Sequence, residues 1–295
     1  MQTNGSQTAQ SRAALASHEA GLSVLSELLA GSGHAVVLSG AGCSTGSGIP
    51  DYRDKLGRWK RPQPVQYRDF VRDPATRQRY WTRSFVGWER IYSARPNRAH
   101  RALAKMETDG RLAHLITQNV DGLHQRAGSA KVTDLHGRLD TVACIACGEG
   151  QSRAEFQARL HAANSDWRPV SATIAPDGDA DIDAYGCTGF VVPSCESCGG
   201  IVKPSVVFFG ESVPRERVEQ AWAEVNRADL LLVAGSSLMV FSGYRFARGA
   251  AERGVPVVAV NIGRTRADEL LTVKIEADCG LVFEALSGQT EIKKA

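Results

Sequence analysis

The chain has 295 residues, of which 43% are hydrophobic and 23% charged, with a formal net charge of +3 at pH 7. This hydrophobic content supplies a substantial core. The sequence contains no apolar run of the roughly 18 residues that a membrane span needs. The net charge is too weakly basic for a nucleic-acid-binding surface. Residues 1–19 are polar without a signal-peptide core and predict a disordered tail, and residues 289–295 form a short C-terminal tail. We expect a cytoplasmic protein, or one of the mitochondrial matrix if it is eukaryotic, with neither membrane nor nucleic acid as a partner.

Five short apolar runs alternate with helical stretches along the chain, at residues 35–38, 112–117, 132–135, 230–234 and 255–260. Such alternation predicts an α/β fold with a Rossmann-like, doubly wound parallel sheet. Each run ends in glycine or polar residues, and ligands of open α/β sheets bind at the carboxyl ends of the strands. We therefore expect all five ends to meet at one crevice.

The first run leads into Gly40-Ala41-Gly42, where the missing side chains let the backbone approach a phosphate closely. The ordinary dinucleotide fingerprint would need a third glycine at position 45, where Thr45 stands. The loop continues to Pro50-Asp51-Tyr52-Arg53, which adds an acid, an aromatic ring and a guanidinium. These reactive groups beside a phosphate turn favour chemistry on the nucleotide itself rather than hydride transfer.

A helical segment over residues 67–92 interrupts the sheet pattern and predicts a second wall for the crevice. Residues 139–203 break the alternation again and predict a small inserted module. It contains two cysteine pairs, Cys144-x-x-Cys147 and Cys195-x-x-Cys198, in a chain without a secretory signal. Four thiolates in two such pairs favour a closed, structural zinc site over redox-active pairs.

Taken together, these motifs resemble one family. The segments that carry the resemblance follow one another in the same order as in the sirtuins, the NAD-dependent protein-lysine deacylases. They are the loop over residues 40–53, Thr117-Gln118-Asn119-Val120-Asp121-Gly122-Leu123-His124, Leu135-His136-Gly137, the cysteine pairs, residues 203–211, Gly235-Ser236-Ser237-Leu238 and Asn261-Ile262-Gly263. The resemblance covers residues 20–288. Tyr52 and the segment over residues 241–246 place the chain nearest the class II branch, which includes the mitochondrial lipoamidase and ADP-ribosyltransferase type.

This resemblance implies an NAD-binding domain made of residues 20–138 and 204–288, a zinc-binding module at 139–203 with a second helical part near 67–92, and acyl-lysine proteins as substrates. It implies His136 as general base, acting on a ribose hydroxyl of NAD with Asn119 and Asp121 beside it, so that the acyl group passes to ADP-ribose and nicotinamide is released. The implied cofactor-binding residues are Gly40, Ala41, Gly42, Ser44, Pro50, Asp51, Tyr52, Arg53, Gln118, Asn119, Asp121, Gly235, Ser236, Ser237, Asn261, Ile262, Gly263 and Cys279. The implied zinc ligands are Cys144, Cys147, Cys195 and Cys198.

The apolar segment Val206, Val207, Phe208, Phe209 and Gly210 is suited to a strand, and the resemblance implies that it pairs with the substrate backbone. An acidic acyl group would require a cation in the acyl-lysine tunnel, for which Tyr80 and Arg83 are candidates at helical spacing; a packed tyrosine and a surface arginine are the alternative. Protein mono-ADP-ribosylation, a silent NAD-binding module and a zinc-dependent nucleic-acid binder are the alternative functions.

Overall fold

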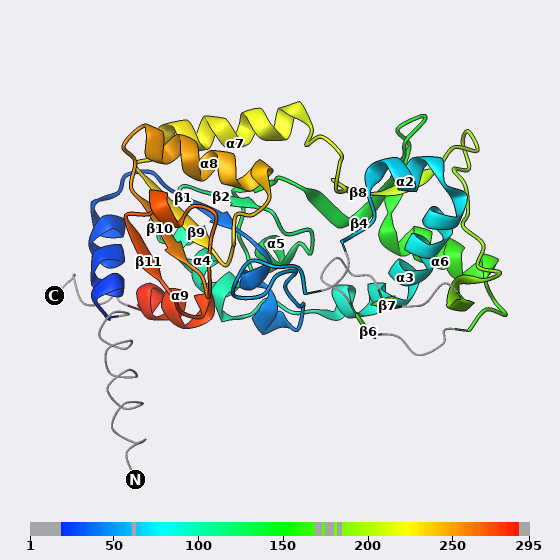
Figure 1. The fold of residues 1–295 in the computed structure, drawn as a ribbon, viewed down its shortest axis with the longest axis horizontal. Helices are drawn as coiled ribbons and strands as arrows, with labels where there is room; N and C mark the ends of the chain where they lie inside the picture. The colour runs from blue at the N-terminus through cyan, green and yellow to red at the C-terminus, as the bar shows by residue number, and fades with distance from the viewer. Residues whose placement is uncertain (1–18, 61–62, 169–172, 175–179, 182–184, 289–295) are drawn as a thin grey trace, which may run out of the picture.

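The computed structural model describes residues 19–60, 63–168, 173–174, 180–181 and 185–288. The tails expected at 1–19 and 289–295 lie outside the described residues except for Glu19, which is in the first helix and not in a disordered tail. Figure 1 shows two lobes side by side, one built on a twisted sheet and the other mainly helical. No helix in the described ranges is both long and apolar enough to cross a membrane.

The larger lobe is built on a six-stranded sheet in which every neighbouring pair is parallel, in the order β11-β10-β9-β1-β2-β3. Its strands are β1 (Ala35–Ser39), β2 (His114–Thr117), β3 (Val132–Asp134), β9 (Leu230–Ala234), β10 (Val257–Val260) and β11 (Val273–Ile275). All five predicted strands are confirmed, and β11 is an addition. The chain order reverses between β1 and β9, which is where such sheets bind ligands.

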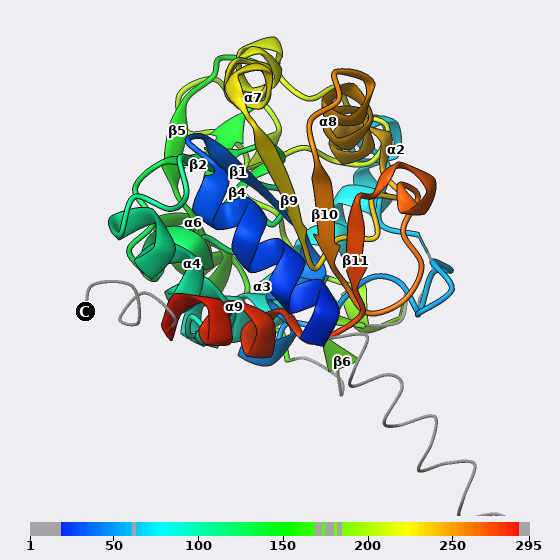
Figure 2. The same ribbon diagram turned by 90° about the vertical axis from the view of Figure 1, so that its left-hand side faces the viewer.

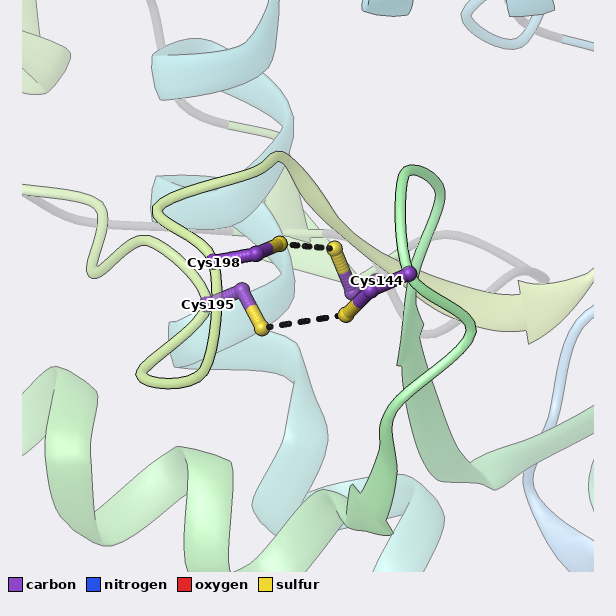
Figure 3. Close-up of side chains that lie close together, drawn as sticks. Cys144, Cys195 and Cys198 are labelled. Carbon is purple, nitrogen blue, oxygen red and sulfur yellow. Dashed lines mark hydrogen bonds between the residues drawn. The ribbon is translucent and has the colours of Figure 1, made fainter.

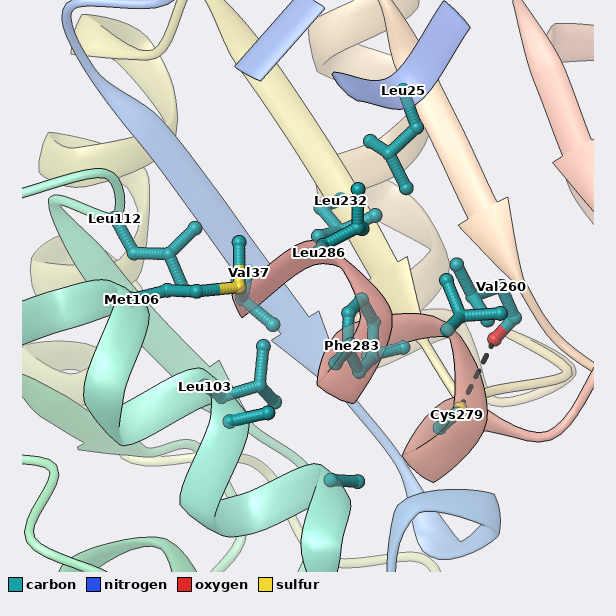
Figure 4. Close-up of a cluster of buried hydrophobic side chains, with 14 of the residues drawn as sticks. Leu25, Val37, Leu103, Met106, Leu112, Leu232, Val260, Cys279, Phe283 and Leu286 are labelled. Atoms are coloured by element: carbon teal, nitrogen blue, oxygen red, sulfur yellow. Dashed lines mark hydrogen bonds between the residues drawn. The ribbon is translucent and has the colours of Figure 1, made fainter. Parts of the chain in front are cut away.

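Helices cover both faces of this sheet, as Figure 2 shows. Alternate residues along each strand point to opposite faces: Val37 and Leu232 pack against residues 19–31, α4 and α9, whereas Val36 and Leu231 pack against α7 and α8. Figure 4 shows part of the first of these cores, around Leu103 and Phe283. Besides the helix over residues 19–31, the helices of this lobe are α4 (Arg98–Thr108), α5 (Leu123–Arg126), α7 (Arg215–Arg227), α8 (Phe241–Glu252) and α9 (Cys279–Gly288). Its short 3-10 turns are η1 (Ala41–Cys43), η2 (Thr45–Ser47) and η4 (Asp268–Leu270).

The smaller lobe combines helices with a three-stranded antiparallel sheet in the order β5-β4-β8. Its elements are α2 (Tyr67–Arg72), α3 (Pro74–Ser93), β4 (Gly137–Cys144), β5 (Gly150–Ser152), α6 (Arg153–Ala163), β6 (Thr173–Ile174), β7 (Ala180–Asp181), η3 (Tyr185–Cys187) and β8 (Val202–Val206). A core of aromatic and aliphatic side chains, including the buried Trp81 and Phe156, joins α2, α3 and α6 to β4 and β8.

The helical segment predicted over residues 67–92 is two helices. Asp73 has extended backbone, and its carboxylate accepts hydrogen bonds from the backbone N–H groups of Ala75 and Thr76. Pro74 follows at the first helical position, where its missing N–H costs nothing. An aspartate cap and a proline therefore end α2 and start α3.

The tips of β1 and β9 approach each other closely at the switch point of the sheet. The backbone N–H of Gly42 donates to the carbonyl of Gly235 at 2.8 Å, and that of Gly40 donates to the carbonyl of Ala234 at 2.9 Å. Gly235 has φ of 59°, and a Cβ atom there would lie 2.4 Å from the backbone nitrogen of Cys43. Only glycine fits at this crossing.

We predict that Gly235→Ala lowers the free energy of unfolding by about 3 kcal/mol or more, because left-handed strain of about 1–2 kcal/mol adds to a backbone clash. Gly254→Ala is the matched control, since Gly254 has φ of 75° but open space where a Cβ would stand. It should show the conformational strain alone. Urea denaturation of both variants measures the difference, and equal losses would show that the close approach at Gly235 is not restrictive.

Candidate active site

A cavity of about 420 Å³ lies at the carboxyl ends of β1, β2, β9 and β10 and is closed on the other side by residues of the smaller lobe. His136, which follows the end of β3, also lines it, so the predicted meeting of all five strand ends is confirmed. The predicted site residues that line it are Gly40, Ala41, Gly42, Ser44, Asp51, Tyr52, Arg53, Gln118, Asn119, Asp121, His136, Val206, Val207, Phe208, Phe209, Gly210, Gly235, Ser236, Ser237, Asn261 and Ile262.

Three predicted cofactor residues, Pro50, Gly263 and Cys279, are not part of the cavity lining. The backbone N–H of Gly263 donates to Glu276 Oε1 at 3.0 Å. Cys279 is buried at the start of α9, and its thiol donates to the carbonyl of Val260 at 3.4 Å (Figure 4). Their roles toward a nucleotide stay predictions.

His136 lies between β3 and β4, where the chain passes from one lobe to the other, and it lines the cavity. Its Nδ1 lies 3.0 Å from the carbonyl oxygen of Gln118, and its Nε2 lies 2.7 Å from Ser242 Oγ. The pKa of His136 is lowered to about 4, mainly by burial and also by the charges of Arg245 and Arg217, against the hydrogen bond to the carbonyl of Gln118, which raises it. The ring is therefore neutral at pH 7.

The tautomer of His136 follows from its partners. A carbonyl oxygen can only accept a hydrogen bond, so Nδ1 carries the proton and Nε2 carries the lone pair. A neutral imidazole with its lone pair at a cavity wall can accept a proton from a bound hydroxyl. This geometry gives the site a general base.

An amide and carboxylate network covers the end of β2. Asn119 Nδ2 donates to the carbonyl of Gly40 at 3.0 Å and to Ser44 Oγ at 3.1 Å, and the Ser44 hydroxyl donates to Asp121 Oδ2 at 2.7 Å. The other carboxylate oxygen of Asp121 accepts from the backbone N–H of Leu123, which is an Asx turn. The network ties the glycine loop after β1 to the loop after β2 and leaves both at the cavity wall.

The loop over residues 50–60 brings three aromatic rings together beside the cavity. Trp59 stands edge-on to Tyr52 and Phe209, with ring centroids 6.1 Å and 5.5 Å apart, and the guanidinium of Arg53 lies 4.0 Å above the Trp59 ring. Trp59 lines the cavity but was missed by the sequence analysis, because nothing in its spacing marks it as a site residue. These rings form an apolar wall next to the charged groups of Asp51 and Arg53.

The segment after β8 forms the opposite wall. The prediction of a strand over Val206–Gly210 is wrong for all but its first residue, because β8 ends at Val206 and the N–H of Glu211 donates to the carbonyl of Phe208 in a turn. The N–H of Val207 donates to the carbonyl of His136 at 2.8 Å. Glu211 closes this turn, since its carboxylate accepts from the N–H of Phe208 at 2.8 Å and pairs with Lys203 Nζ at 3.0 Å. Val206 through Gly210 are thereby held directly beside His136.

The four cysteines of the predicted quartet meet at the far end of β4, with all their sulfur atoms within 4.8 Å of one another. Figure 3 shows Cys195 and Cys198 on one loop facing Cys144 at the end of β4. The sulfurs of Cys144 and Cys198 are 3.5 Å apart and those of Cys147 and Cys195 are 3.7 Å apart. A tetrahedral zinc with Zn–S bonds of about 2.3 Å needs sulfurs roughly 3.8 Å apart, so the quartet fits a structural zinc ion.

Both cysteine pairs sit on the same kind of turn. The N–H of Gly148 donates to the carbonyl of Cys144, and the N–H of Gly199 donates to the carbonyl of Cys195 at 2.9 Å, with φ of 78° and 71° at the two glycines. The matching turns present two thiols each, which is the arrangement of a zinc knuckle.

Two further histidines are buried beneath the glycine loop. The rings of His100 and His124 are 4.7 Å apart, and His124 Nε2 lies 2.9 Å from Ser39 Oγ at the end of β1. Burial lowers the pKa of His124 well below its usual value and, as the largest cause, that of His100 to about 4. Both rings are neutral at pH 7 and form part of the support under the loop.

The site defines a class of protein, a nucleotide-dependent enzyme with a structural metal site. The nucleotide wall is the glycine loop at the switch point of a Rossmann-like sheet, the reactive group is the neutral histidine at the cavity wall, and the four-thiol cluster fits the metal. The model of the Sir2 family matches residues 40–242. The chain belongs to this family, the sirtuins.

Relatives and solved structures agree with this assignment. An NAD-dependent protein deacetylase of Xanthomonas campestris is 59% identical over 82% of this chain and 83% of its own length. The mitochondrial NAD-dependent protein lipoamidase sirtuin-4 of Bos taurus is 48% identical over 83% of this chain and 79% of its own. A Sir2 structure with a p53 peptide and NAD+ superposes with a TM-score of 0.72 at 31% identity, over 90% of this chain and 97% of that one.

We predict that stability falls as the pH is lowered from about 6.5 toward 4. The folded-state pKa values of His100, His124 and His136 lie below the value near 6.5 of an unfolded chain, so the unfolded state binds more protons in this range. His100 and His136, whose pKa values are about 4, each contribute a loss of about 2 kcal/mol between pH 7 and pH 5, and His124 acts in the same direction. Urea denaturation at pH 7 and pH 5 measures the loss; His136→Ala should show a smaller loss than the wild type, and a flat profile in the wild type would contradict the burial argument.

We predict that Cys195→Ala loses zinc and lowers the melting temperature, because three thiolates leave the tetrahedral shell incomplete. Cys187→Ala is the control, since Cys187 is also a buried cysteine of the smaller lobe but lies outside the quartet. Metal analysis and thermal unfolding test both variants. Unchanged metal content and melting temperature in Cys195→Ala would rule out the quartet as a zinc site.

Proposed function

We propose that the protein is an NAD-dependent protein-lysine deacetylase or deacylase that transfers the acyl group from lysine to ADP-ribose. One observation carries the proposal: the lone pair of His136 Nε2 faces a single cavity whose walls are the glycine loop of a Rossmann-like sheet and the segment Val206–Gly210. A base, a nucleotide-binding wall and a peptide-binding wall are the three parts that this reaction requires.

The residues proposed to hold NAD lie at the strand ends. The turn at Gly40–Gly42, which has no bulky side chain and whose glycine N–H groups are held by the carbonyls of Ala234 and Gly235, is proposed to lie against the phosphates. The hydroxyls of Ser236 and Ser237 are proposed to bond them, and Asn261, which follows β10, is proposed to bond the adenosine ribose. Asn119 and Asp121 supply both donors and acceptors for the carboxamide and the second ribose. When bound, NAD supplies the electrophilic sugar carbon, the nicotinamide leaving group and the hydroxyl that accepts the acyl group.

His136 is proposed to take the proton of that hydroxyl at Nε2. Its low pKa keeps the lone pair available throughout the neutral range, at the cost of basicity. The carbonyl of Gln118 offsets part of this cost, because it stabilises the protonated ring through Nδ1–H. Tyr52, with Trp59 and Phe209, is proposed to exclude water from the sugar carbon.

The acyl-lysine is proposed to enter beside Val206–Gly210, with the substrate backbone adding to this segment as a strand. The walls there are apolar, from Ile49, Leu139 and the buried Tyr80, whose ring packs on Phe208 at 5.0 Å. Arg83 does not line the cavity, and the cationic side chains among its described lining residues are Arg53 and Arg264. We therefore propose a neutral acyl group, such as acetyl or lipoyl, over an acidic one.

The protein partners are proposed to be acyl-lysine proteins, with no nucleic acid among them, since the net charge is only +3. The cytoplasmic location stays a prediction.

We predict that His136→Ala lowers deacylation by more than about 100-fold while NAD binding persists, because the variant loses only the proton acceptor. The measurement is nicotinamide release with acetyl-, lipoyl-, methylglutaryl- and succinyl-lysine peptides, together with calorimetric NAD binding. Protein-bound ADP-ribose is followed in the same samples as the alternative product. Full turnover in His136→Ala would refute the assignment of the base, and a preference for the succinyl peptide would refute the neutral acyl group.

A further inference from the structure

Ser242 makes the shortest contact of the general base. It is the second residue of α8, lines the cavity, and places its hydroxyl oxygen 2.7 Å from His136 Nε2. Ser242 lies within residues 241–246, the segment that resembles the class II branch, and its sequence position alone implies no role.

The direction of this hydrogen bond is fixed by the tautomer. Because Nδ1 of His136 donates to the carbonyl of Gln118, Nε2 can only accept, and the Ser242 hydroxyl is the donor. The imidazole ring is thus held at both nitrogens, by a carbonyl at the end of β2 and by a hydroxyl at the start of α8.

These two partners of the ring belong to one packed unit. Gly243, next to Ser242, packs so closely on the side chain of Gln118 that a Cβ atom would lie 2.4 Å from Gln118 Oε1. The carbonyl of Val240 accepts from the N–H groups of Gly243 and Tyr244, which fixes the first turn of α8. Arg245 Nε donates to the carbonyl of Ser242 at 3.1 Å. These contacts fix the backbone of Ser242, and from this fixed position its hydroxyl reaches Nε2 of His136.

We propose that Ser242 is a positioning residue for the reaction: its hydroxyl holds the lone pair of His136 Nε2 toward the cavity and keeps it unprotonated until a substrate hydroxyl takes its place. This rests on the proposed function, in which Nε2 accepts the proton of a sugar hydroxyl. A donor to the neutral ring disfavours protonation, and the charged groups that act on the ring in the same direction are Arg245 on α8 and Arg217 on α7.

The test compares Ser242→Ala with Ser242→Thr, which keeps a hydroxyl. In the NAD-free protein with ¹⁵N-labelled histidine, the Nε2 resonance of His136 at pH 7.5 should change in Ser242→Ala and return toward the wild-type position in Ser242→Thr. On acidification, Ser242→Ala should protonate about 0.5–1 pH unit higher than the wild type, which is the size of one neutral hydrogen bond. The His136→Ala variant assigns the resonance.

In the deacylase assay, Ser242→Ala should lower kcat by about 10-fold with the KM for the acyl peptide unchanged, and Ser242→Thr should recover most of it. A wild-type protein that releases no nicotinamide would overturn the proposed function. An active wild type with Ser242→Ala equal to it in resonance and in kcat would overturn the role of Ser242 alone. Loss of activity that Ser242→Thr does not recover, with an unchanged Nε2 resonance, would also overturn it.

Discussion

The hydrogen bond from His136 Nδ1 to the carbonyl of Gln118 is the contact on which the site depends. It selects the tautomer, and so decides which nitrogen faces the cavity. It also joins the two lobes, because Gln118 follows β2 of the large sheet and His136 immediately precedes β4 of the small one. A second hydrogen bond supports the same junction, since the N–H of Val207, which follows β8, donates to the carbonyl of His136.

The burial of His136 has two opposite effects on its action as a base. A ring removed from water stays neutral and keeps its lone pair, yet it resists the charge that proton transfer places on it. The same dehydration acts on His100 and His124 under the glycine loop, where it serves packing only. A site built on buried neutral imidazoles is therefore suited to neutral pH, and both activity and folding are expected to fail together in acid.

Sequence patterns could predict the parts that local chemistry decides. Apolar runs ending in Gly40, Gln118, Gly235 and Asn261 predicted parallel strands and their shared crevice, and two Cys-x-x-Cys pairs predicted the quartet. The three-residue β11 could not be predicted, since its strand identity comes from pairing with β10. Trp59 and Ser242 could not either, because a tryptophan in a loop and a serine in a helix become site residues only through tertiary contacts with Phe209 and His136.

The zinc quartet lies far from the base, yet the fold links them. Cys144 ends β4, and Gly137, next to His136, begins it; at about 3.3 Å per residue this strand spans roughly 23 Å. β8 runs antiparallel beside it, pairing Val202 with Cys144 near the metal and Val206 with Gly137 near the base. A zinc ion that clamps the knuckles would fix the register of both strands at one end. The pairing changes register between Gly137 and Val142, so Val206 is fixed at the other end, where the N–H of Val207 donates to the carbonyl of His136. A closed metal site with no chemistry of its own thus supports one end of the strand pair whose other end carries the base and the Val206–Gly210 wall.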